Sequence, residues 1–261
     1  MHEHQDDPFW IFLHMHKCAG TYVVHAAQRS GFVLPADHRN GNLPEAEGRQ
    51  VFYAGMPRER LRAILSRERA RGTNFLAMEW DFPCIEDFPC DLGLRFLTVL
   101  RDPLARARSN FRMDKVNGWC DHPDVTFTGH FDGLWLYRSH DYYTRKLCAA
   151  GRHRALRGED FTRADAVLAR FDAVIVLGRD NVDPCLARLG MDQADPGARH
   201  ALTEAEARRR VPPSRLAIRD EELVEFCGRN AFDVALFSRW AERPLCERFL
   251  AGHRRDARAE A

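Results

Sequence analysis

Residues 9–22 read FWIFLHMHKCAGTY, and this stretch decides the fold. Its first five residues, Phe9–Leu13, are apolar without alternation, which is typical of a strand buried in a parallel sheet. Lys17 and Cys18 come before a helical pattern over residues 19–29, which opens with two small residues and a threonine. Glycine lets a backbone approach an anion closely, and the N–H groups at a helix N-terminus point at it. The stretch therefore predicts a phosphate-binding loop, to which Lys17 adds a positive charge and Thr21 a hydroxyl donor.

Similar apolar runs recur along the chain and are separated by helical patterns. Further strands are expected at residues 95–100 and 173–177, with weaker candidates at 51–54 and 74–78. Helices are expected at 58–71, 103–116, 140–150, 163–170 and 181–189, and almost throughout from Thr203 onward. Strands that alternate with helices indicate an α/β fold. We expect a P-loop-like three-layer fold with a mostly parallel central sheet of about four to six strands, flanked by helices, and a helical C-terminal region.

The chain is expected to form a single domain over residues 1–261, because no internal repeat and no Ser/Gly-rich linker divides it. Residues 38–50 and 118–129 are rich in turn-forming residues and are expected to be long loops. The polar segment 253–261 is expected to fray.

Composition excludes several classes of protein. Lys plus Arg number 39 and Asp plus Glu number 38, so the formal net charge is +1, which argues against a general nucleic-acid binder. No apolar run approaches the roughly 18 residues of a membrane span, and the N-terminal region lacks the pattern of a secretory signal. A cytoplasmic enzyme or binding domain is the expectation.

The eight cysteines form no CxxC pair, so zinc-ribbon and thioredoxin-like sites have no support. They are spread through a chain of ordinary size, unlike the cysteines of a disulfide scaffold. Buried, reduced thiols are therefore expected, although a bridge between Cys84 and Cys90 stays open.

The loop after the first strand is not the P-loop of a nucleoside triphosphatase. That loop requires GxxxxGK[ST], in which the lysine follows the second glycine. Here Lys17 precedes both Gly20 and Thr21, and no DxD or NKxD-like element follows downstream. The order of residues argues against a kinase of the P-loop type.

A second motif lies in residues 95–112, which read RFLTVLRDPLARARSNFR. An apolar strand ends at Arg101, Pro103 opens a helix, and Ser109 lies eight residues after the arginine. Two helical turns span about seven residues, so this hydroxyl faces roughly the same side as the strand end. A guanidinium and a hydroxyl placed in this way can hold one phosphate together. Equally, Arg101 and Asp102 can form a local ion pair and Ser109 can be an ordinary surface residue.

The two motifs together resemble those of sulfotransferases. The first resembles the 5′-phosphosulfate loop, PKxGGT or PKTAGT, and the second resembles RDPxxRxxSxY of the 3′-phosphate site. Residues 140–151, HDYYTRKLCAAG, resemble the NxxTRxLxG segment of bacterial relatives of the Golgi carbohydrate sulfotransferases, and residues 230–237, NAFDVALF, resemble their NxxDxxLY helix. These similarities run from about residue 9 to residue 240. The resemblance implies an enzyme that uses 3′-phosphoadenosine 5′-phosphosulfate (PAPS).

The same resemblance implies roles for individual residues. Lys17 would bind the bridging or leaving-group oxygen. The loop residues Cys18, Ala19, Gly20, Thr21 and Tyr22 would cradle the 5′-phosphate, and Arg101 with Ser109 would hold the 3′-phosphate. The scheme requires no metal, and no His or carboxylate cluster has ligand spacing. Three positions depart from the family pattern: His16 replaces a proline, Cys18 replaces Thr or Ser and is a weaker donor, and Phe111 replaces a tyrosine.

An acceptor hydroxyl needs a general base, typically His or Glu. Glu79 is the first candidate, because it follows the expected strand at 74–78 where relatives carry a catalytic Glu or a GH pair. His16, beside Lys17, is the second. Alternatively, Glu79 or Asp81 pairs with an arginine in a structural salt bridge. The histidines His130 and His140 are weaker candidates and are expected to be solvated.

The acceptor cannot be named from the sequence, and a sugar, a lipid or a small metabolite all fit. Four aromatic residues, Trp80, Phe82, Trp119 and Trp135, are candidates for an acceptor pocket, although core packing is favoured for Trp135. Arg145 either contacts a substrate or supports a carboxylate, and Arg208–Arg210 are expected to form a solvated helix face. No nucleic-acid partner or membrane span is expected, and oligomeric state is open. The alternatives are a P-loop-like kinase and a catalytically silent nucleotide-binding or interaction protein.

Overall fold

The structure is a computed structural model that describes residues 8–44, 51–133, 135–191 and 202–249. Its described residues form a four-stranded, all-parallel sheet in the order β2-β1-β3-β4. The strands are β1 (Phe9–Leu13), β2 (Phe75–Met78), β3 (Leu94–Arg101) and β4 (Ala173–Leu177). The expected α/β fold with a parallel central sheet is confirmed. The tail at 253–261 and residues 45–50 of the expected loop lie outside the described residues.

The strands form where apolar residues run without a break. Every residue of β1 and β2 is buried, as a sheet covered on both faces requires. The weak strand candidate at 51–54 is wrong, because this segment pairs with a side chain instead of a strand. The backbone N–H groups of Tyr53 and Ala54 donate to the Asp81 carboxylate at 2.8–3.0 Å.

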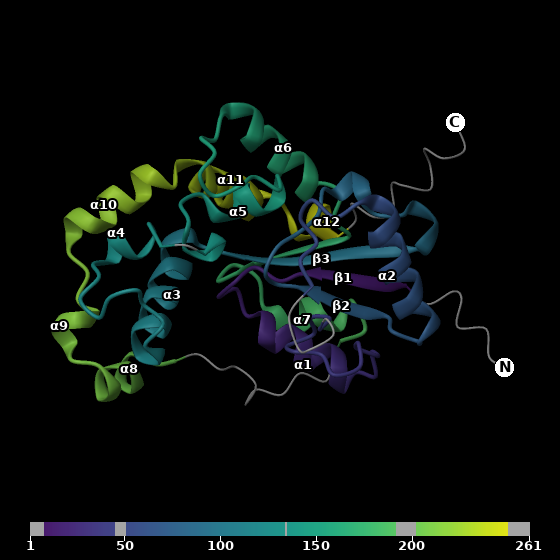
Figure 1. The fold of residues 1–261 in the computed structure, drawn as a ribbon, viewed down its shortest axis with the longest axis horizontal. Helices are drawn as coiled ribbons and strands as arrows, with labels where there is room; N and C mark the ends of the chain where they lie inside the picture. Colours follow the sequence, from purple (N-terminus) through teal and green to yellow (C-terminus); the bar gives the residue numbers. More distant parts are fainter. Residues whose placement is uncertain (1–7, 45–50, 134, 192–201, 250–261) are drawn as a thin grey trace.

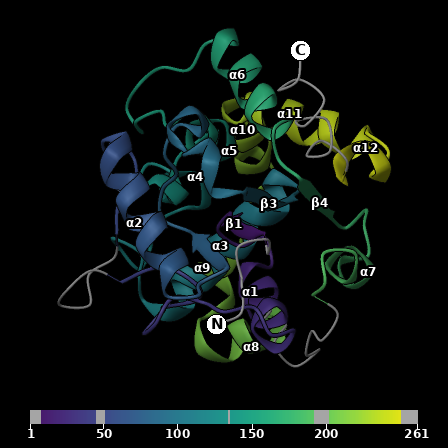
Figure 2. The same cartoon turned by 90° about the vertical axis from the view of Figure 1, so that its right-hand side faces the viewer.

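Helices cover both faces of the sheet. Figures 1 and 2 both show α1 (Gly20–Arg29) below the strands, and α6 (Gly158–Leu168) and α11 (Ala231–Glu242) above them. The remaining longer helices near the sheet are α2 (Arg58–Ala70) and α3 (Pro103–Asn117), and the shorter ones are α5 (Tyr142–Leu147), α7 (Val182–Ala187) and α12 (Leu245–Phe249). Three short 3-10 helices lie at Ile85–Asp87, Cys90–Leu92 and Leu136–Arg138.

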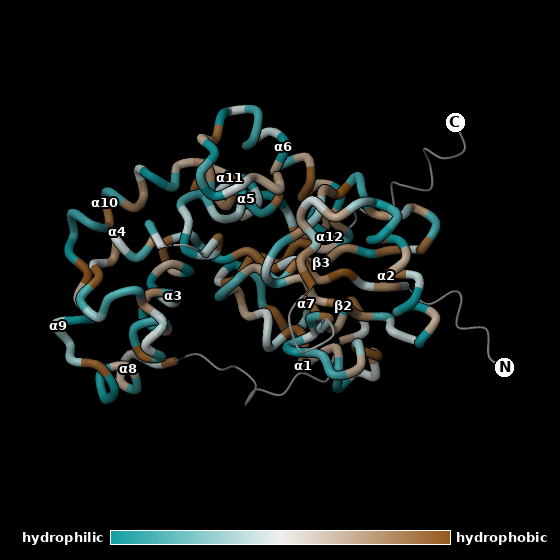
Figure 3. Tube along the Cα trace, in the orientation of Figure 1, coloured by the Kyte–Doolittle hydropathy of each residue, from teal (hydrophilic) through white to brown (hydrophobic). Residues whose placement is uncertain are grey.

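A group of helices extends beyond the sheet at the left of Figure 1. It comprises α4 (Phe127–His130), α8 (Glu204–Arg210), α9 (Pro213–Leu216) and α10 (Asp220–Arg229), and α3 connects it to the sheet. A second apolar cluster, built from Ala107, Phe111, Phe127, Phe131 and Phe226, lies among these helices. The main core surrounds the strands, which form the brown centre of Figure 3.

The register of the strands brings four chain segments to one edge of the sheet. Leu13 at the end of β1 pairs with Met78 of β2 and with Thr98 of β3, and Arg101 pairs with Leu177 of β4. The residues that follow these strands therefore emerge together at the carboxyl edge, where open parallel sheets bind ligands. Here α3 begins sharply, because Asp102 accepts from the backbone N–H of Ala105 and proline occupies the first turn.

All eight cysteines lie in the described residues and are free. Cys18, Cys148 and Cys185 are buried, whereas Cys90, Cys227 and Cys246 are exposed. The expectation of buried thiols is therefore wrong for these three. None of the described helices is long and apolar enough to cross a membrane.

Candidate functional site

The loop between β1 and α1 adopts an unusual backbone conformation. Lys17 has φ 64° and Ala19 has φ 58°, both in the left-handed region that non-glycine residues rarely enter. Such residues concentrate at ligand-binding loops, and alternating backbone conformations turn successive N–H groups toward one point. No side chain caps the N-terminus of α1 in the described part of the chain. An uncapped helix N-terminus after a loop of this kind is suited to an anion.

Gly20 serves a purpose that the sequence did not indicate. Its φ is not left-handed, but a Cβ built there would lie 1.7 Å from Nε2 of His14. Helix α1 therefore starts directly against the His14 imidazole, and only glycine leaves room for that ring.

A cleft of about 450 Å³ opens at the carboxyl edge of the sheet. Nine of the ten sequence-predicted positions line it: His16, Lys17, Ala19, Gly20, Thr21, Tyr22, Glu79, Arg101 and Ser109. Both motifs thus meet at one site, although Lys17 and Arg101 lie 84 positions apart. The cleft also includes Asp180, Asn181 and Val182, which follow β4.

The two basic residues of the cleft are held next to each other. Nη1 of Arg101 donates to the backbone carbonyl of Lys17 at 3.2 Å. Burial lowers the pKa of Lys17, and the nearby guanidinium of Arg101 adds to this effect. An anion bound beside both side chains would offset the repulsion between their charges.

Cys18 is the one predicted loop residue that does not line the cleft. Its side chain is buried, and its Sγ lies 3.2 Å from the Tyr143 hydroxyl. That hydroxyl also donates to the backbone carbonyl of Arg101 at 2.7 Å. The backbone N–H of Cys18 also has a partner, because it donates to the carbonyl of Met15 at 3.1 Å. Cys18 therefore supports the loop, and the expected phosphate contact is left to its neighbours. The segment at 140–151 supports both motifs from behind.

Glu79 lies between two imidazoles, not against an arginine. Its carboxylate oxygens are 3.2 Å from Nδ1 of His16 and 3.5 Å from Nδ1 of His14. Burial alone raises the pKa of Glu79, but the two imidazoles and the Lys146 ammonium overcome this and hold it well below its usual range. Burial lowers the pKa of His16, and it lowers that of His14 to about 4. The site thus holds an ionised carboxylate beside neutral histidines at neutral pH.

The two ring nitrogens of His16 differ in their hydrogen bonding. Nδ1 contacts Glu79, whereas Nε2 is buried with no hydrogen-bond partner among the described residues. A buried imidazole nitrogen without a partner is uncommon and is characteristic of sites that bind a ligand or react. This arrangement resembles a base held in one tautomer by a carboxylate.

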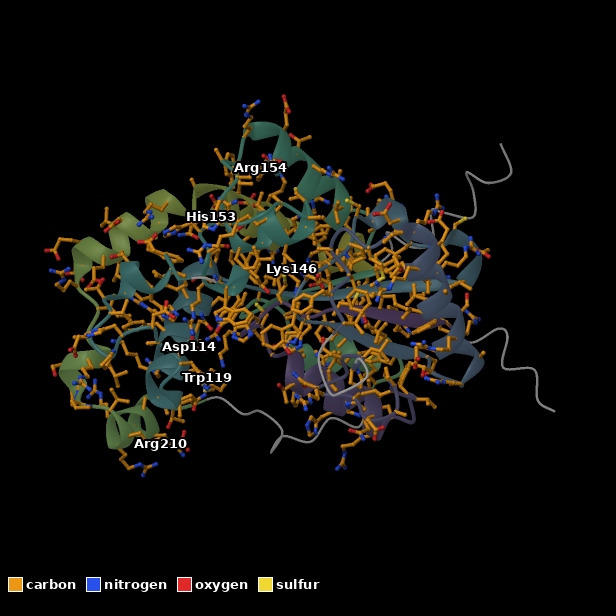
Figure 4. All side chains as sticks on the ribbon, viewed as in Figure 1. Asp114, Trp119, Lys146, His153, Arg154 and Arg210 are labelled. Atoms are coloured by element: carbon orange, nitrogen blue, oxygen red, sulfur yellow. The ribbon has the colours of Figure 1, made fainter. Side chains whose placement is uncertain are left out.

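Lys146 supports this centre from the interior, where Figure 4 labels it. Its Nζ donates to the carbonyls of His14 at 2.8 Å, Met78 at 3.2 Å and Glu79 at 2.5 Å. Three carbonyls match the three donors of an ammonium. Burial lowers the pKa of Lys146 to about 7, and these contacts fix the ends of β1 and β2. Nothing in the sequence pattern around Lys146 predicts this supporting role.

A second, smaller cavity of about 180 Å³ adjoins the cleft and shares His16 and Glu79 with it. The rest of its lining consists of Phe52, Trp80, Asp81, Trp135, Leu136 and Tyr137. The expectation of core packing for Trp135 is wrong, since its side chain is 51% exposed. Phe82 is buried in the core, and Trp119 is exposed without lining either cavity.

Other candidates lie outside the site. Arg145 donates to the carbonyls of His140, Gly151 and Arg154, and so stabilises a loop. His130 is buried against Asp114 at 3.3 Å and is not solvated. Arg208–Arg210 are exposed on α8, as expected, and Figure 4 places Arg210 at the margin of the molecule.

Several residues that line the two cavities were not predicted from the sequence. His14 stands two positions before His16 in the deciding stretch, and the alternation of a strand end could have drawn attention to it. Asp180 and Asn181 follow a predicted strand, so their place at the carboxyl edge was a usable signal. Tyr137 and Phe52 come from irregular segments that carry no such signal.

In the part of the chain that the structure describes, no cluster of three or more His, Cys, Asp or Glu side chains could hold a metal ion. The chain matches no family model and no curated protein at a significant level.

Proposed function

We propose that this protein is a sulfotransferase that moves a sulfuryl group from PAPS to an acceptor hydroxyl. The observation that carries the proposal is the meeting of Lys17, Arg101 and Ser109 in one cleft beside an uncapped helix N-terminus. The three side chains and the loop backbone supply charge and donors for a ligand with two separate phosphate groups. The free cysteines support a reducing compartment such as the cytoplasm.

Different residues of the cleft would hold different parts of PAPS. The left-handed loop and the first turn of α1 would hold the 5′-phosphosulfate. Arg101 and Ser109 would hold the 3′-phosphate, which ordinary adenosine phosphates lack. Lys17 stands at the loop, where its ammonium would stabilise the charge that develops on the 5′-phosphate oxygen.

His16 is the base that the contacts favour. Glu79 is strongly ionised and shared by two imidazoles, so it is a weak base and a good positioning residue. Neutral His16 takes the acceptor proton on Nε2 while the hydroxyl oxygen bonds to sulfur. The bond from sulfur to the 5′-phosphate oxygen breaks, and its electron pair stays on that oxygen. In-line transfer of this kind depends on position more than on covalent chemistry.

The test is calorimetric titration with 3′-phosphoadenosine 5′-phosphate, with adenosine 5′-phosphate as the comparison ligand. We expect a preference for the first nucleotide, and a loss of about 10- to 100-fold in its affinity for Arg101→Ala, because charge-assisted phosphate contacts are lost. Arg108→Ala is the matched control. Arg108 is exposed on α3, the helix that carries Ser109, and does not line the cleft.

Equal binding of both nucleotides, with Arg101→Ala unchanged, would contradict the donor site. Tight binding of 3′-phosphoadenosine 5′-phosphate without transfer to any acceptor would favour a silent nucleotide-binding protein with the same site.

A further inference from the structure

The two adjoining cavities differ in the charge of their walls. The cleft is lined by two cations, Lys17 and Arg101, and by two carboxylates, Glu79 and Asp180, so its charges balance. The small cavity is lined by two carboxylates, those of Glu79 and Asp81, and by no lysine or arginine among the described residues. His16 adds no charge at neutral pH, because burial lowers its pKa. The lining of the small cavity is therefore negative, whereas the charges in the lining of the cleft balance.

Both carboxylates are fixed in place. Glu79 contacts two imidazoles, and Asp81 accepts from the backbone N–H groups of Tyr53 and Ala54. Neither can rotate away without breaking these bonds. An anionic group that entered the small cavity would lie within a few ångströms of a fixed negative charge, which costs about 1–4 kcal/mol near a protein surface.

Aromatic rings form the rest of the walls. Trp80 contacts Trp135 and Tyr137 edge-on, with centroids 6.4 Å apart in both pairs, and Tyr137 lies 4.4 Å from the His16 ring. Trp135 and Phe52 are 51% and 59% exposed, so apolar rings stand at the surface beside the cavity. Exposed rings around a small cavity suit a ligand with a flat, apolar face.

Two residues of the lining also carry polar atoms that have no partner. Nε2 of His16 is a free acceptor, and the indole N–H of Trp80 is a free donor; both are buried without a partner among the described residues. A hydroxyl that donates to His16 and an oxygen that accepts from Trp80 would satisfy both. The volume of about 180 Å³ is below that of sites for drug-sized ligands, and suits a single ring.

We propose that the small cavity is the acceptor site, and that it takes one ring bearing a hydroxyl on an uncharged or cationic acceptor and rejects anionic acceptors. The ring stacks against Trp135 and Trp80, with its hydroxyl at His16. This inference rests on the proposed sulfuryl transfer. The chemistry is shared by a sugar ring and a phenol, so the test includes both.

The experiment measures quenching of tryptophan fluorescence, excited selectively, by ligands that differ only in charge. One series is methyl β-glucopyranoside with methyl β-glucuronide. The other is tyramine, 4-hydroxyphenylacetamide and 4-hydroxyphenylacetate. Each is titrated into the free protein and into the protein loaded with 3′-phosphoadenosine 5′-phosphate. We expect the uncharged or cationic members of one series to bind about tenfold more tightly than the anion.

Trp135→Ala should weaken that binding by about 3- to 10-fold, since a stacking ring is lost. Trp119→Ala is the matched control, because Trp119 is 56% exposed but lines neither cavity. Its removal should leave the affinity unchanged, and melting curves check that both variants fold.

Equal or tighter binding of the anions would overturn the inference, as would equal effects of the two tryptophan variants. If neither series binds while 3′-phosphoadenosine 5′-phosphate binds through Arg101, the inference fails and the proposed function stands. If the nucleotide does not bind but the charge preference appears, the proposed function fails. The small cavity would then still be a site for an uncharged or cationic ring that bears a hydroxyl.

Discussion

At the scale of single residues, His16 has the most consequential position. It follows β1, lines both cavities and presents one unpartnered nitrogen. Glu79 orients it through Nδ1, much as a carboxylate orients the histidine of a catalytic triad. In the proposed reaction the two residues therefore have separate roles, and substitutions can distinguish them.

We expect His16→Asn to lower kcat by about 10²- to 10⁴-fold with nucleotide affinity nearly unchanged, because the base is lost and the donor contacts remain. Glu79→Gln should also lower kcat, since the imidazole loses its orienting charge. Because the pKa of His16 is lowered, the acid limb of kcat/KM for the wild type should lie below pH 6.5. Initial rates of sulfuryl transfer across pH measure all three.

His25→Asn is the control, because His25 is exposed on α1 and belongs to the lining of neither cavity. Full activity in His16→Asn with none in Glu79→Gln would make Glu79 itself the base.

The sequence already indicated most of the residues around this centre, because Lys17, Arg101 and Ser109 belong to motifs with fixed spacing. It ranked Glu79 above His16 as a base, since only contacts show that the carboxylate is shared by two imidazoles. The side chain of Cys18 also looked like a ligand contact, yet it is buried against Tyr143. The direction of a side chain in a loop is not encoded by spacing.

At the scale of elements, the passage from β1 into α1 determines whether the site can form. His14 follows the last residue of β1 and packs against the start of α1, with its ring stacked on that of Phe12 at 5.3 Å between centroids. The left-handed residues between them turn the chain within a few positions. Loop and helix start are therefore one packed unit.

Gly20→Ala should destabilise the protein by about 1–3 kcal/mol, because its Cβ would overlap the His14 imidazole and force a shift. It should also weaken binding of 3′-phosphoadenosine 5′-phosphate. Urea unfolding and calorimetry measure the two effects.

Gly158→Ala is the control, since Gly158 opens α6 with nothing within 4 Å of an added Cβ; its effect should stay within about 0.5 kcal/mol. The double variant His14→Ala, Gly20→Ala should be less destabilised than the sum of its parts. Strict additivity would show that the two residues do not clash.

At the scale of the whole molecule, hydrogen bonds connect the segment at residues 140–151 to the segment at residues 230–237. Asp233 of α11 accepts from the backbone N–H groups of Tyr143 and Thr144, and Asp141 accepts from the backbone N–H of Asp233. Asn230 accepts from the N–H of Asp141 at 2.8 Å. Hydrogen bonds between residues about 90 positions apart thus connect α11 to α5, the helix whose Tyr143 contacts Cys18 and Arg101.

This connection has a pH dependence. Burial and the neighbouring carboxylate of Asp233 raise the pKa of Asp141 to about 7, above its unfolded value of 3.8. The stability that this group contributes is complete below pH 3.8 and is lost as the pH rises through about 7. Asp141→Asn stays neutral and tolerates the left-handed φ of 49°. It should be about 2–4 kcal/mol more stable than the wild type above pH 7, and about equal near pH 4.

Urea unfolding at both pH values measures the difference. Asp37→Asn is the matched control, because Asp37 is exposed and has a left-handed φ of 56°. A loss of stability for Asp141→Asn at every pH would contradict the electrostatic account.

The fold as a whole was predictable from the sequence, because buried parallel strands such as Phe9–Leu13 and Ala173–Leu177 have uninterrupted apolar patterns. The segment at 51–54 shows the limit of that reasoning. Its hydrogen bonds go to Asp81, a partner that apolar pattern cannot reveal. The small cavity was equally hidden, since Trp135 and Phe52 come from irregular segments brought together by the tertiary fold.

The two cavities share His16 and Glu79, and this has a thermodynamic consequence. A molecule in one cavity touches side chains that a molecule in the other also touches, so the two binding equilibria are linked. Linkage is reciprocal: the factor by which an occupant of the cleft changes affinity in the small cavity equals the factor in the opposite direction. Neither cavity therefore has an affinity of its own until the occupancy of its neighbour is stated.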